Sequence, residues 1–285
     1  MIKTLGVIGA GTMGAGIAHV AALHGCEVLL HEASAEALHK AMERIQMNMK
    51  KSIQRGKFSQ EKFAEVIARI HPGTNLENFN HAEFVIEAVF EELSLKREIL
   101  TRLDSICTDT TVFASNTSSL SITSLSTASA HPHRVVGMHF FNPAQVMELI
   151  EVVWGQFTKI ETAQQTMEFA RQIGKTPVLV KDAPGFIVNR VARPFYGEAL
   201  RLLGEGVATV DEIDRIVRLE GGFKMGPFEL MDLIGIDVNL TVTQSVYDQF
   251  FQEPRFRPHP IQQTMVETGM LGRKTGKGFY DYTKT

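Results

Sequence analysis

Short apolar runs and glycine-rich breaks alternate along the first thirty residues of the chain. Leu5–Ile8 is an apolar run of strand length, and the alanine-rich stretch Ile17–His24 has the composition of a helix that stops at Gly25. Glu27–His31 is a second apolar run of strand length. A strand, a turn, a helix and another strand within about 30 residues predict one βαβ unit with two parallel strands.

The same alternation continues as far as Lys181. Ser34 to about Ile70 is polar, has helical spacing and is interrupted at Gly56. The further elements expected here are a buried strand at Phe84–Val89, a helix at Glu92–Leu103, and strands at Thr111–Ala114, Val135–Phe140 and Val178–Val180. Strands that alternate with helices predict an α/β fold with a doubly wound parallel sheet.

The pattern changes after Lys181. Asp182–Gly185 has the composition of a turn, and strand signals largely vanish beyond it. The helices expected there are Phe186–Leu203, a helix opened by a capping box at Thr209-x-x-Glu212, Asp237–Phe251 and Pro260–Met270. We therefore predict two domains, residues 1–182 with the sheet and residues 183–285 with helices alone.

Composition narrows the class of protein. The formal charge is 29 − 32 = −3 without a basic stripe, which argues against nucleic acid or an anionic membrane surface as the main partner. No run approaches the ~18 consecutive apolar residues of a membrane span. Cys26 and Cys107 lie far apart without metal-ligand spacing, so we expect reduced, buried thiols and no metal site. The expected location is the cytoplasm, or an organelle matrix for a processed chain.

The first glycine cluster carries a dinucleotide-binding pattern. Gly9, Gly11 and Gly14 fit G-x-G-x-x-G, in which the glycines permit a tight turn, close approach of a pyrophosphate and close packing of the helix on the sheet. Thr12 and Met13 complete the turn, and the helix after it offers free N–H groups and a positive dipole end to phosphates. Such a motif between a strand and a helix predicts a Rossmann-type domain.

An acid follows the second predicted strand. Glu32 lies 23 residues after Gly9, where a carboxylate accepts hydrogen bonds from the adenosine ribose hydroxyls and repels a 2′-phosphate. This position predicts NAD and not NADP as cofactor. The alternative interpretation is a solvated carboxylate at the end of a strand.

A histidine and a glutamate interrupt two apolar runs. His139 lies in the predicted strand Val135–Phe140, just before Asn142-Pro143, and a histidine is suited to act as general base near neutral pH. Glu151 lies in the apolar run Met147–Val153 and needs a partner if it is buried. Pairing would satisfy both groups, but the sequence does not show that they meet. A core histidine bonded to a carbonyl is the alternative.

Further polar motifs complete the pattern. Ala114–Ser119 follows a strand and is dense in hydroxyl and amide groups, which suits either ligand contacts or a loop that caps the next helix. Six more motifs follow the glycine turn in order: Val85–Glu91, Phe113–Ser119, Met138–Pro143, Lys181–Arg190, Met225–Leu230 and Gly276–Tyr280. With these motifs essentially the whole chain resembles the L-3-hydroxyacyl-CoA dehydrogenases, most closely the short bacterial 3-hydroxybutyryl-CoA dehydrogenases.

The resemblance implies a role for each matching residue. His139 matches the general base and Glu151 its partner, while substrate contacts fall on Ser118, Asn142 and Asn189. The positions that match residues around the cofactor are Glu87, Ala88, Val89, Glu91, Lys96 and Asn116, and those that match the region contacting the CoA tail are Lys50, Lys51 and Lys57. One residue departs from the family pattern, because the acid after the second strand is usually aspartate and here is Glu32.

Several questions stay open at this stage. We expect the acyl site in the cleft between the domains, and a homodimer formed through apolar residues of the helical domain: Phe195, Leu202, Leu203, Ile213 and Ile216. The alternatives are a dehydrogenase of free 3-hydroxy or sugar acids, and a non-catalytic NAD-binding relative. The length of the acyl chain is undetermined, as is a second carboxylate on it, for which Arg193, Arg255 and Arg257 are candidates.

Overall fold

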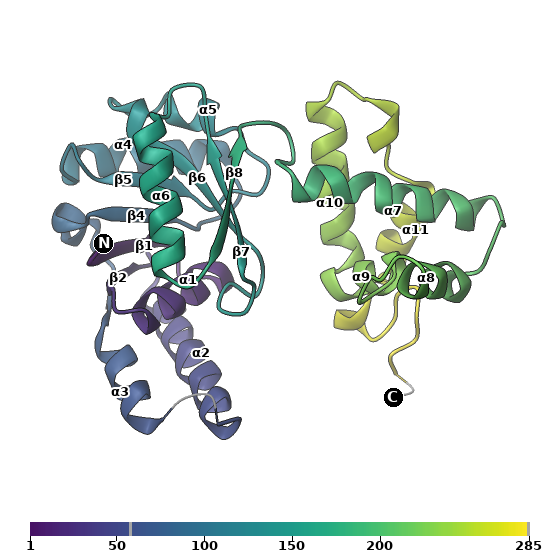
Figure 1. The fold of residues 1–285 in the computed structure, drawn as a ribbon, viewed down its shortest axis with the longest axis horizontal. Helices are drawn as coiled ribbons and strands as arrows, with labels where there is room; N and C mark the ends of the chain where they lie inside the picture. Colours follow the sequence, from purple (N-terminus) through teal and green to yellow (C-terminus); the bar gives the residue numbers. More distant parts are fainter. Residues whose placement is uncertain (57–58, 284–285) are drawn as a thin grey trace. The chain divides into compact units, whose positions relative to one another are not determined.

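The computed structural model of the protein describes residues 1–56 and 59–283 (Figure 1). The chain divides into two compact units, Met1–Ala183 and Pro184–Thr285. The first unit holds the sheet, and the second is built from helices. None of the helices formed by the described residues is both long and apolar enough to cross a membrane.

An eight-stranded sheet forms the centre of the first unit. Its strands are β1 (Thr4–Ile8), β2 (Glu27–His31), β3 (Ile70–Gly73), β4 (Phe84–Glu87), β5 (Val112–Ser115), β6 (Val135–Phe140), β7 (Leu149–Trp154) and β8 (Thr176–Lys181). Their order across the sheet is β3-β2-β1-β4-β5-β6-β7-β8. The strand order reverses between β1 and β4, which is where a doubly wound sheet opens a crevice for ligands. The predicted α/β class, a doubly wound and mainly parallel sheet beside a helical part, is confirmed.

Two strands differ from the sequence-based prediction. β7 runs antiparallel to β6, because residues 141–148 are too few for the helical crossover that a parallel neighbour needs. β3 lies at the edge of the sheet, parallel to β2, in a segment that we expected to finish a helix. Its sequence contains Pro72, a residue that hides a strand signal and that a sheet accepts at its edge.

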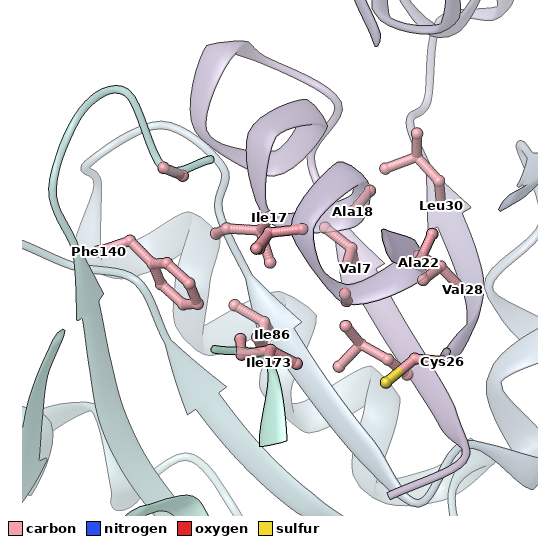
Figure 2. Close-up of a cluster of buried hydrophobic side chains, with 14 of the residues drawn as sticks. Val7, Ile17, Ala18, Ala22, Cys26, Val28, Leu30, Ile86, Phe140 and Ile173 are labelled. Atoms are coloured by element: carbon pink, nitrogen blue, oxygen red, sulfur yellow. The ribbon is translucent and has the colours of Figure 1, made fainter. Parts of the chain in front are cut away.

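Helices cover both faces of this sheet. They are α1 (Thr12–Leu23), α2 (Ala35–Gln54), α3 (Gln60–Ala68), α4 (Leu93–Ile106), α5 (Ile122–Ser126) and α6 (Ile160–Gln172), with 3₁₀ turns at Leu76–His81 and Pro132–Arg134. Side chains of β4 alternate between two cores: Phe84 and Ile86 pack with residues of α1 and α6, whereas Val85 packs with residues of α4. Figure 2 shows the first core, with Ile17 of α1 beside Ile86 and Val7.

The second unit has its own apolar core. Its helices are α7 (Val188–Gly204), α8 (Val210–Leu219), α9 (Pro227–Ile234), α10 (Ile236–Gln249) and α11 (Pro260–Glu267), with 3₁₀ turns at Pro254–Phe256 and Arg273–Thr275. The predicted capping box of Thr209 and Glu212 is present at the start of α8. The short helix α9 was not expected, although Gly226-Pro227 before Glu229 is a sequence typical of a helix start.

Two buried carboxylates hold the second unit together. Asp214 accepts hydrogen bonds from the backbone N–H of Phe228 (2.9 Å) and from the Tyr280 hydroxyl (2.9 Å). Asp232 accepts from the backbone N–H groups of Phe279 and Tyr280, each at 3.0 Å. These contacts link α8 and α9 to the segment after α11. Residues of the Met225–Leu230 and Gly276–Tyr280 motifs therefore have a structural role in these contacts.

Candidate active site

The glycine turn lies between β1 and α1. Gly9 has a φ of 91°, and a Cβ at this position would stand 2.6 Å from the Ala88 carbonyl oxygen. A Cβ at Gly14 would stand 1.7 Å from the Gly9 carbonyl oxygen, so the helix could not approach the turn. At Gly11, in contrast, the described residues other than its chain neighbours place no heavy atom within 4 Å of the corresponding Cβ position. The three glycines therefore provide the turn, the close packing and the open backbone that a pyrophosphate requires.

The N-terminus of α1 faces this open space. Gly11 precedes the first helical residue, Thr12, and no side chain of the described residues caps the helix there. The first N–H groups of α1 thus remain directed outward, next to Thr12 and Met13. A pocket runs along this end of the sheet and is lined by Gly9, Gly11, Met13, Glu32, Val89 and Arg102, among others.

Glu32 follows β2 and borders the same pocket. Its carboxylate accepts hydrogen bonds from the backbone N–H of Ala10 (3.0 Å) and from that of Ala33 (2.9 Å). The longer glutamate side chain therefore turns back onto the glycine turn. Its contact with a ribose stays a prediction.

A buried lysine organises the loops after β4 and β5. Lys96 is 2% exposed, and its ammonium contacts Glu87 (2.7 Å) and Glu91 (3.3 Å). Glu87 also accepts from the Ser115 hydroxyl (2.7 Å), which joins the ends of the two strands. The pocket is lined by Ala88 and Val89 but not by Lys96. The structure thus places Lys96 and Glu87 beneath the loop, and their predicted contact with the cofactor is not tested here.

Glu91 connects this lysine to the serine-rich segment. Its carboxylate accepts from the Thr117 hydroxyl (2.6 Å), from the backbone N–H of Ser118 (2.8 Å) and from that of Ser119 (3.2 Å). Burial alone would raise the pKa of Glu91, but the Lys96 ammonium and these hydrogen bonds lower it below the ordinary value. The carboxylate is therefore ionised at neutral pH and holds the segment that carries Ser118.

Asn116 fixes the neighbouring strand. The side-chain oxygen of Asn116 accepts a hydrogen bond from the backbone N–H of Phe140 (2.9 Å). The backbone N–H of Asn116 donates to the Glu87 carbonyl oxygen (2.8 Å). This residue, expected at the cofactor, therefore also joins the ends of β4, β5 and β6. The sequence of the Ala114–Ser119 segment could not predict these hydrogen bonds, because their partners lie on other strands.

His139 and Glu151 form a buried pair across β6 and β7. The two residues face each other in the antiparallel register, and His139 Nδ1 lies 2.8 Å from Glu151 Oε2. Both side chains are buried, and the imidazole packs against the Phe141 ring, with centroids 4.5 Å apart. A carboxylate that accepts from Nδ1–H fixes the tautomer in which Nε2 carries the lone pair. The pair therefore has the arrangement of a positioned base and its orienting acid.

The remaining site residues are dispersed. Asn142 is exposed directly after β6, and Ser118 lies in the segment after β5. Asn189 belongs to α7 of the second unit. Lys50 and Lys51 are exposed on α2, and Lys57 lies outside the described residues. Within the part of the chain that the structure describes, no three His, Cys, Asp or Glu side chains are grouped to hold a metal ion.

One positioning residue escaped the sequence analysis. The buried Lys175 donates to the carbonyl oxygens of Ala144 (2.7 Å) and Met147 (2.8 Å), and burial lowers its pKa. It thereby fixes the loop between β6 and β7, which begins next to Asn142. A lysine after a glycine in a polar stretch gives no sequence signal for such a role.

These features define a dinucleotide-binding oxidoreductase fold with a histidine–carboxylate pair at the sheet. Residues 4–183 match the family model described as "3-hydroxyacyl-CoA dehydrogenase, NAD binding domain", and residues 185–282 match that of its C-terminal domain. The chain belongs to the 3-hydroxyacyl-CoA dehydrogenase family. The resemblance inferred from the sequence and the NAD-binding domain are thereby confirmed.

Several relatives are similar over nearly the whole chain. A 3-hydroxyadipyl-CoA dehydrogenase of Escherichia coli is 48% identical over 99% of this chain, which spans 59% of that protein's length. A 3-hydroxybutyryl-CoA dehydrogenase of Clostridioides difficile is 39% identical, with 98% of this chain and 99% of the relative covered. The crystal structure of (S)-3-hydroxybutyryl-CoA dehydrogenase from Ralstonia eutropha gives a TM-score of 0.95 at 39% identity, covering 99% and 100% of the two chains.

Proposed function

We propose that the protein is an NAD-dependent dehydrogenase that interconverts L-3-hydroxyacyl-CoA and 3-ketoacyl-CoA esters. The observation that carries this proposal is the buried pair of His139 and Glu151, 2.8 Å apart, in a chain of the 3-hydroxyacyl-CoA dehydrogenase family. The glycine turn supports it, because the open space beside Gly11 and the outward N–H groups of α1 fit a dinucleotide pyrophosphate.

The proposed chemistry assigns one proton to His139. NAD held at the glycine turn would supply the acceptor for the hydride that leaves C3 of the hydroxyacyl group. His139 Nε2 takes the proton of the 3-hydroxyl as the carbonyl forms, and it returns that proton in the reverse direction. Glu151 stabilises the imidazolium through the hydrogen bond on Nδ1 and is a positioning residue. Ser118, Asn142 and Asn189 are the proposed substrate contacts, and Lys50 and Lys57 the proposed contacts of the CoA tail.

We also propose a homodimer formed through the second unit. Four of the five residues that the sequence suggested for this interface do not face outward. Ile213 is buried, and Phe195, Leu202 and Leu203 pack against the core of the second unit. The apolar side chains of α8 that do face outward are Ile216, 59% exposed, and Leu219, 74% exposed. An exposed apolar surface of this kind favours association. The cytoplasm is the proposed location, in keeping with two free, buried cysteines.

The activity is tested by steady-state reduction of acetoacetyl-CoA with NADH and with NADPH. We expect turnover with NADH and a clear preference over NADPH, because Glu32 would repel a 2′-phosphate. Free acetoacetate and sugar acids serve as the comparison substrates. Turnover of a free acid alone would replace the proposed substrate class, and binding of NADH without turnover of any substrate would indicate a non-catalytic relative.

A further inference from the structure

We propose that Gly16 and Lys175 are positioning residues for the hydride transfer, because they hold the loop between β6 and β7 at a fixed place beside the dinucleotide helix α1. The loop, residues 141–148, carries Asn142 and joins the two strands of the buried histidine–carboxylate pair. This inference rests on the proposed function, since it takes Asn142 as a substrate contact. It concerns the first unit alone.

The loop forms a turn that packs on α1. The Pro143 carbonyl accepts hydrogen bonds from the backbone N–H groups of Val146 (2.9 Å) and Met147 (3.0 Å). Ala144 is 2% exposed and belongs to the same apolar core as residues of α1. Asn142 lies two residues before Ala144 and is exposed. A displacement of Ala144 therefore moves the proposed substrate contact.

Gly16 lets the loop come close to the helix. A Cβ at this position would stand 3.0 Å from Ala144 Cβ and 2.9 Å from Gln145 Oε1. The glutamine oxygen ends a flexible side chain and can turn aside, whereas Ala144 Cβ is attached directly to the backbone. Gly16 lies one helical turn after Thr12, the first residue of α1. The contact is therefore next to the end of α1 at which we expect the pyrophosphate.

Lys175 holds the same turn through its carbonyl groups. Its ammonium donates to the carbonyl oxygens of Ala144 (2.7 Å) and Met147 (2.8 Å), and the residue is 8% exposed. Hydrogen bonds from a charged donor are stronger than those from a neutral one. The backbone of Lys175 is fixed as well, because its N–H donates to the Ala170 carbonyl of α6 (2.9 Å). Ala144 is thus held both by α1 and by an anchored ammonium.

This arrangement sets the substrate contact relative to the dinucleotide. The first turn of α1 places the dinucleotide, and the next turn places Ala144 and with it Asn142. The first residue of the loop, Phe141, packs on the His139 imidazole with centroids 4.5 Å apart, so the loop also contacts the base. A misplacement of about 1 Å can lower a rate by ~10²-fold. A smaller shift of the loop should therefore lower kcat and leave the affinity for NADH unchanged.

An exchange of side chains between two positions tests the contact in the full-length protein. Gly16→Ala should lower kcat of acetoacetyl-CoA reduction by about 3- to 30-fold, because the loop has to move by part of an ångström. The Kd of NADH, measured by fluorescence titration, should change by less than about twofold. Adding Ala144→Gly to Gly16→Ala removes the methyl group that the new one meets, and should restore kcat to within about twofold of the wild type.

A second helical glycine provides the matched control. Gly197→Ala places the same methyl group on α7, where the nearest atoms, those of the Arg201 side chain, lie 3.9 Å away. This variant should keep the kcat and the NADH affinity of the wild type. Both alanine substitutions raise the helix propensity, so a loss confined to Gly16→Ala reports the contact with the loop.

Lys175→Met tests the other holding contact. It removes the ammonium from a side chain of similar length and should lower kcat by about tenfold or more, because two charged hydrogen bonds are lost. Combined with Gly16→Ala, the loss should be smaller than the product of the two single losses, since both changes act through Ala144. Lys40→Met alters a surface ion pair on α2 and should leave kcat unchanged. If Lys175→Met does not fold, the exchange between positions 16 and 144 remains as the test.

The outcomes separate positioning from other roles. An unchanged kcat of Gly16→Ala would overturn the inference, and so would a loss that Ala144→Gly does not restore. A parallel loss of NADH affinity would also overturn it, because the contact would then belong to the cofactor site. Absence of acetoacetyl-CoA turnover by the wild type would instead contradict the proposed function.

Discussion

At the scale of single residues, the decisive contact is the one between His139 and Glu151. The sequence identified both as polar residues inside apolar runs, but their meeting depends on β7 running antiparallel to β6, which no local pattern revealed. The same holds for Lys96, Glu91 and Asn116, whose partners come from other loops. Residue types and spacing thus predict which side chains carry chemistry. Which of these side chains contact each other across strands can be determined only from the three-dimensional structure.

The pair leads to a prediction about catalysis. His139→Gln should lower kcat by roughly 10²–10⁴-fold, the usual contribution of a positioned base, and leave the Kd of NADH almost unchanged. Glu151→Gln should have a smaller effect and shift the pH profile of kcat, because the imidazolium that forms during the reaction loses its carboxylate partner. Stopped-flow turnover and NADH fluorescence titration measure the two quantities.

An exposed histidine provides the control for this pair. His39→Gln alters a residue on the surface of α2 and should keep full turnover. Near-normal turnover of His139→Gln would exclude His139 as the base. A parallel loss of NADH affinity would assign it to the cofactor site instead.

At the scale of elements, the success of prediction follows the strength of the local signal. The glycine turn, β1, β2 and the capping box of α8 have short-range patterns, and the sequence located all of them. β3 and α9 were missed because a proline interrupts one and the other is short. Helix α1 was expected as a simple alanine-rich helix, yet it buries a histidine.

That histidine makes the packing of α1 sensitive to pH. His19 is buried, and neither ring nitrogen has a hydrogen-bond partner among the described residues. Burial lowers its pKa from 6.5 to about 4. Between these values the unfolded chain binds the proton and the folded one does not, so the free energy of unfolding falls as the pH falls through this window. The difference between these two pKa values corresponds to about 3 kcal/mol of stability.

Urea unfolding of the wild type and of His19→Gln at pH 7.5 and pH 5 checks this. We expect the wild type to lose more stability over this interval than the variant, since other titrating groups are common to both. Equal losses in the two proteins would show that His19 gains a proton, or a partner, in the folded state.

At the scale of the whole molecule, the two units differ in architecture and in the features they carry. The first contains the glycine turn and the His139–Glu151 pair, and the second contains Asn189, a proposed substrate contact, and an exposed apolar surface on α8. The sequence showed the change from strand patterns to helical patterns after Lys181. The sequence did not predict the apolar surface on α8, because helical spacing alone did not show that Ile216 is exposed and Ile213 is buried.

The proposed homodimer gives the prediction at this scale. Sedimentation velocity at micromolar concentration should show a dimer for the wild type. The double change Ile216→Glu and Leu219→Glu should shift it to the monomer, because it places charges in an apolar interface. Phe157→Glu alters a half-exposed side chain of the first unit and should leave the dimer intact. A monomeric wild type would exclude this assembly, and a dimer unaffected by the double change would move the interface to another surface.

The carboxylates of Asp214 and Asp232 have a consequence for how the protein is made. Their partners Phe279, Tyr280 and Tyr282 follow them by 47 to 66 positions along the chain. During synthesis, α8 and α9 therefore leave the ribosome while Asp214 still lacks the Tyr280 hydroxyl and Asp232 still lacks the N–H groups of Phe279 and Tyr280. The first unit is complete at Ala183 and folds while translation continues, since domains fold as they emerge. The second completes these contacts only after residues 279–282 have emerged, so we expect it to fold after the first.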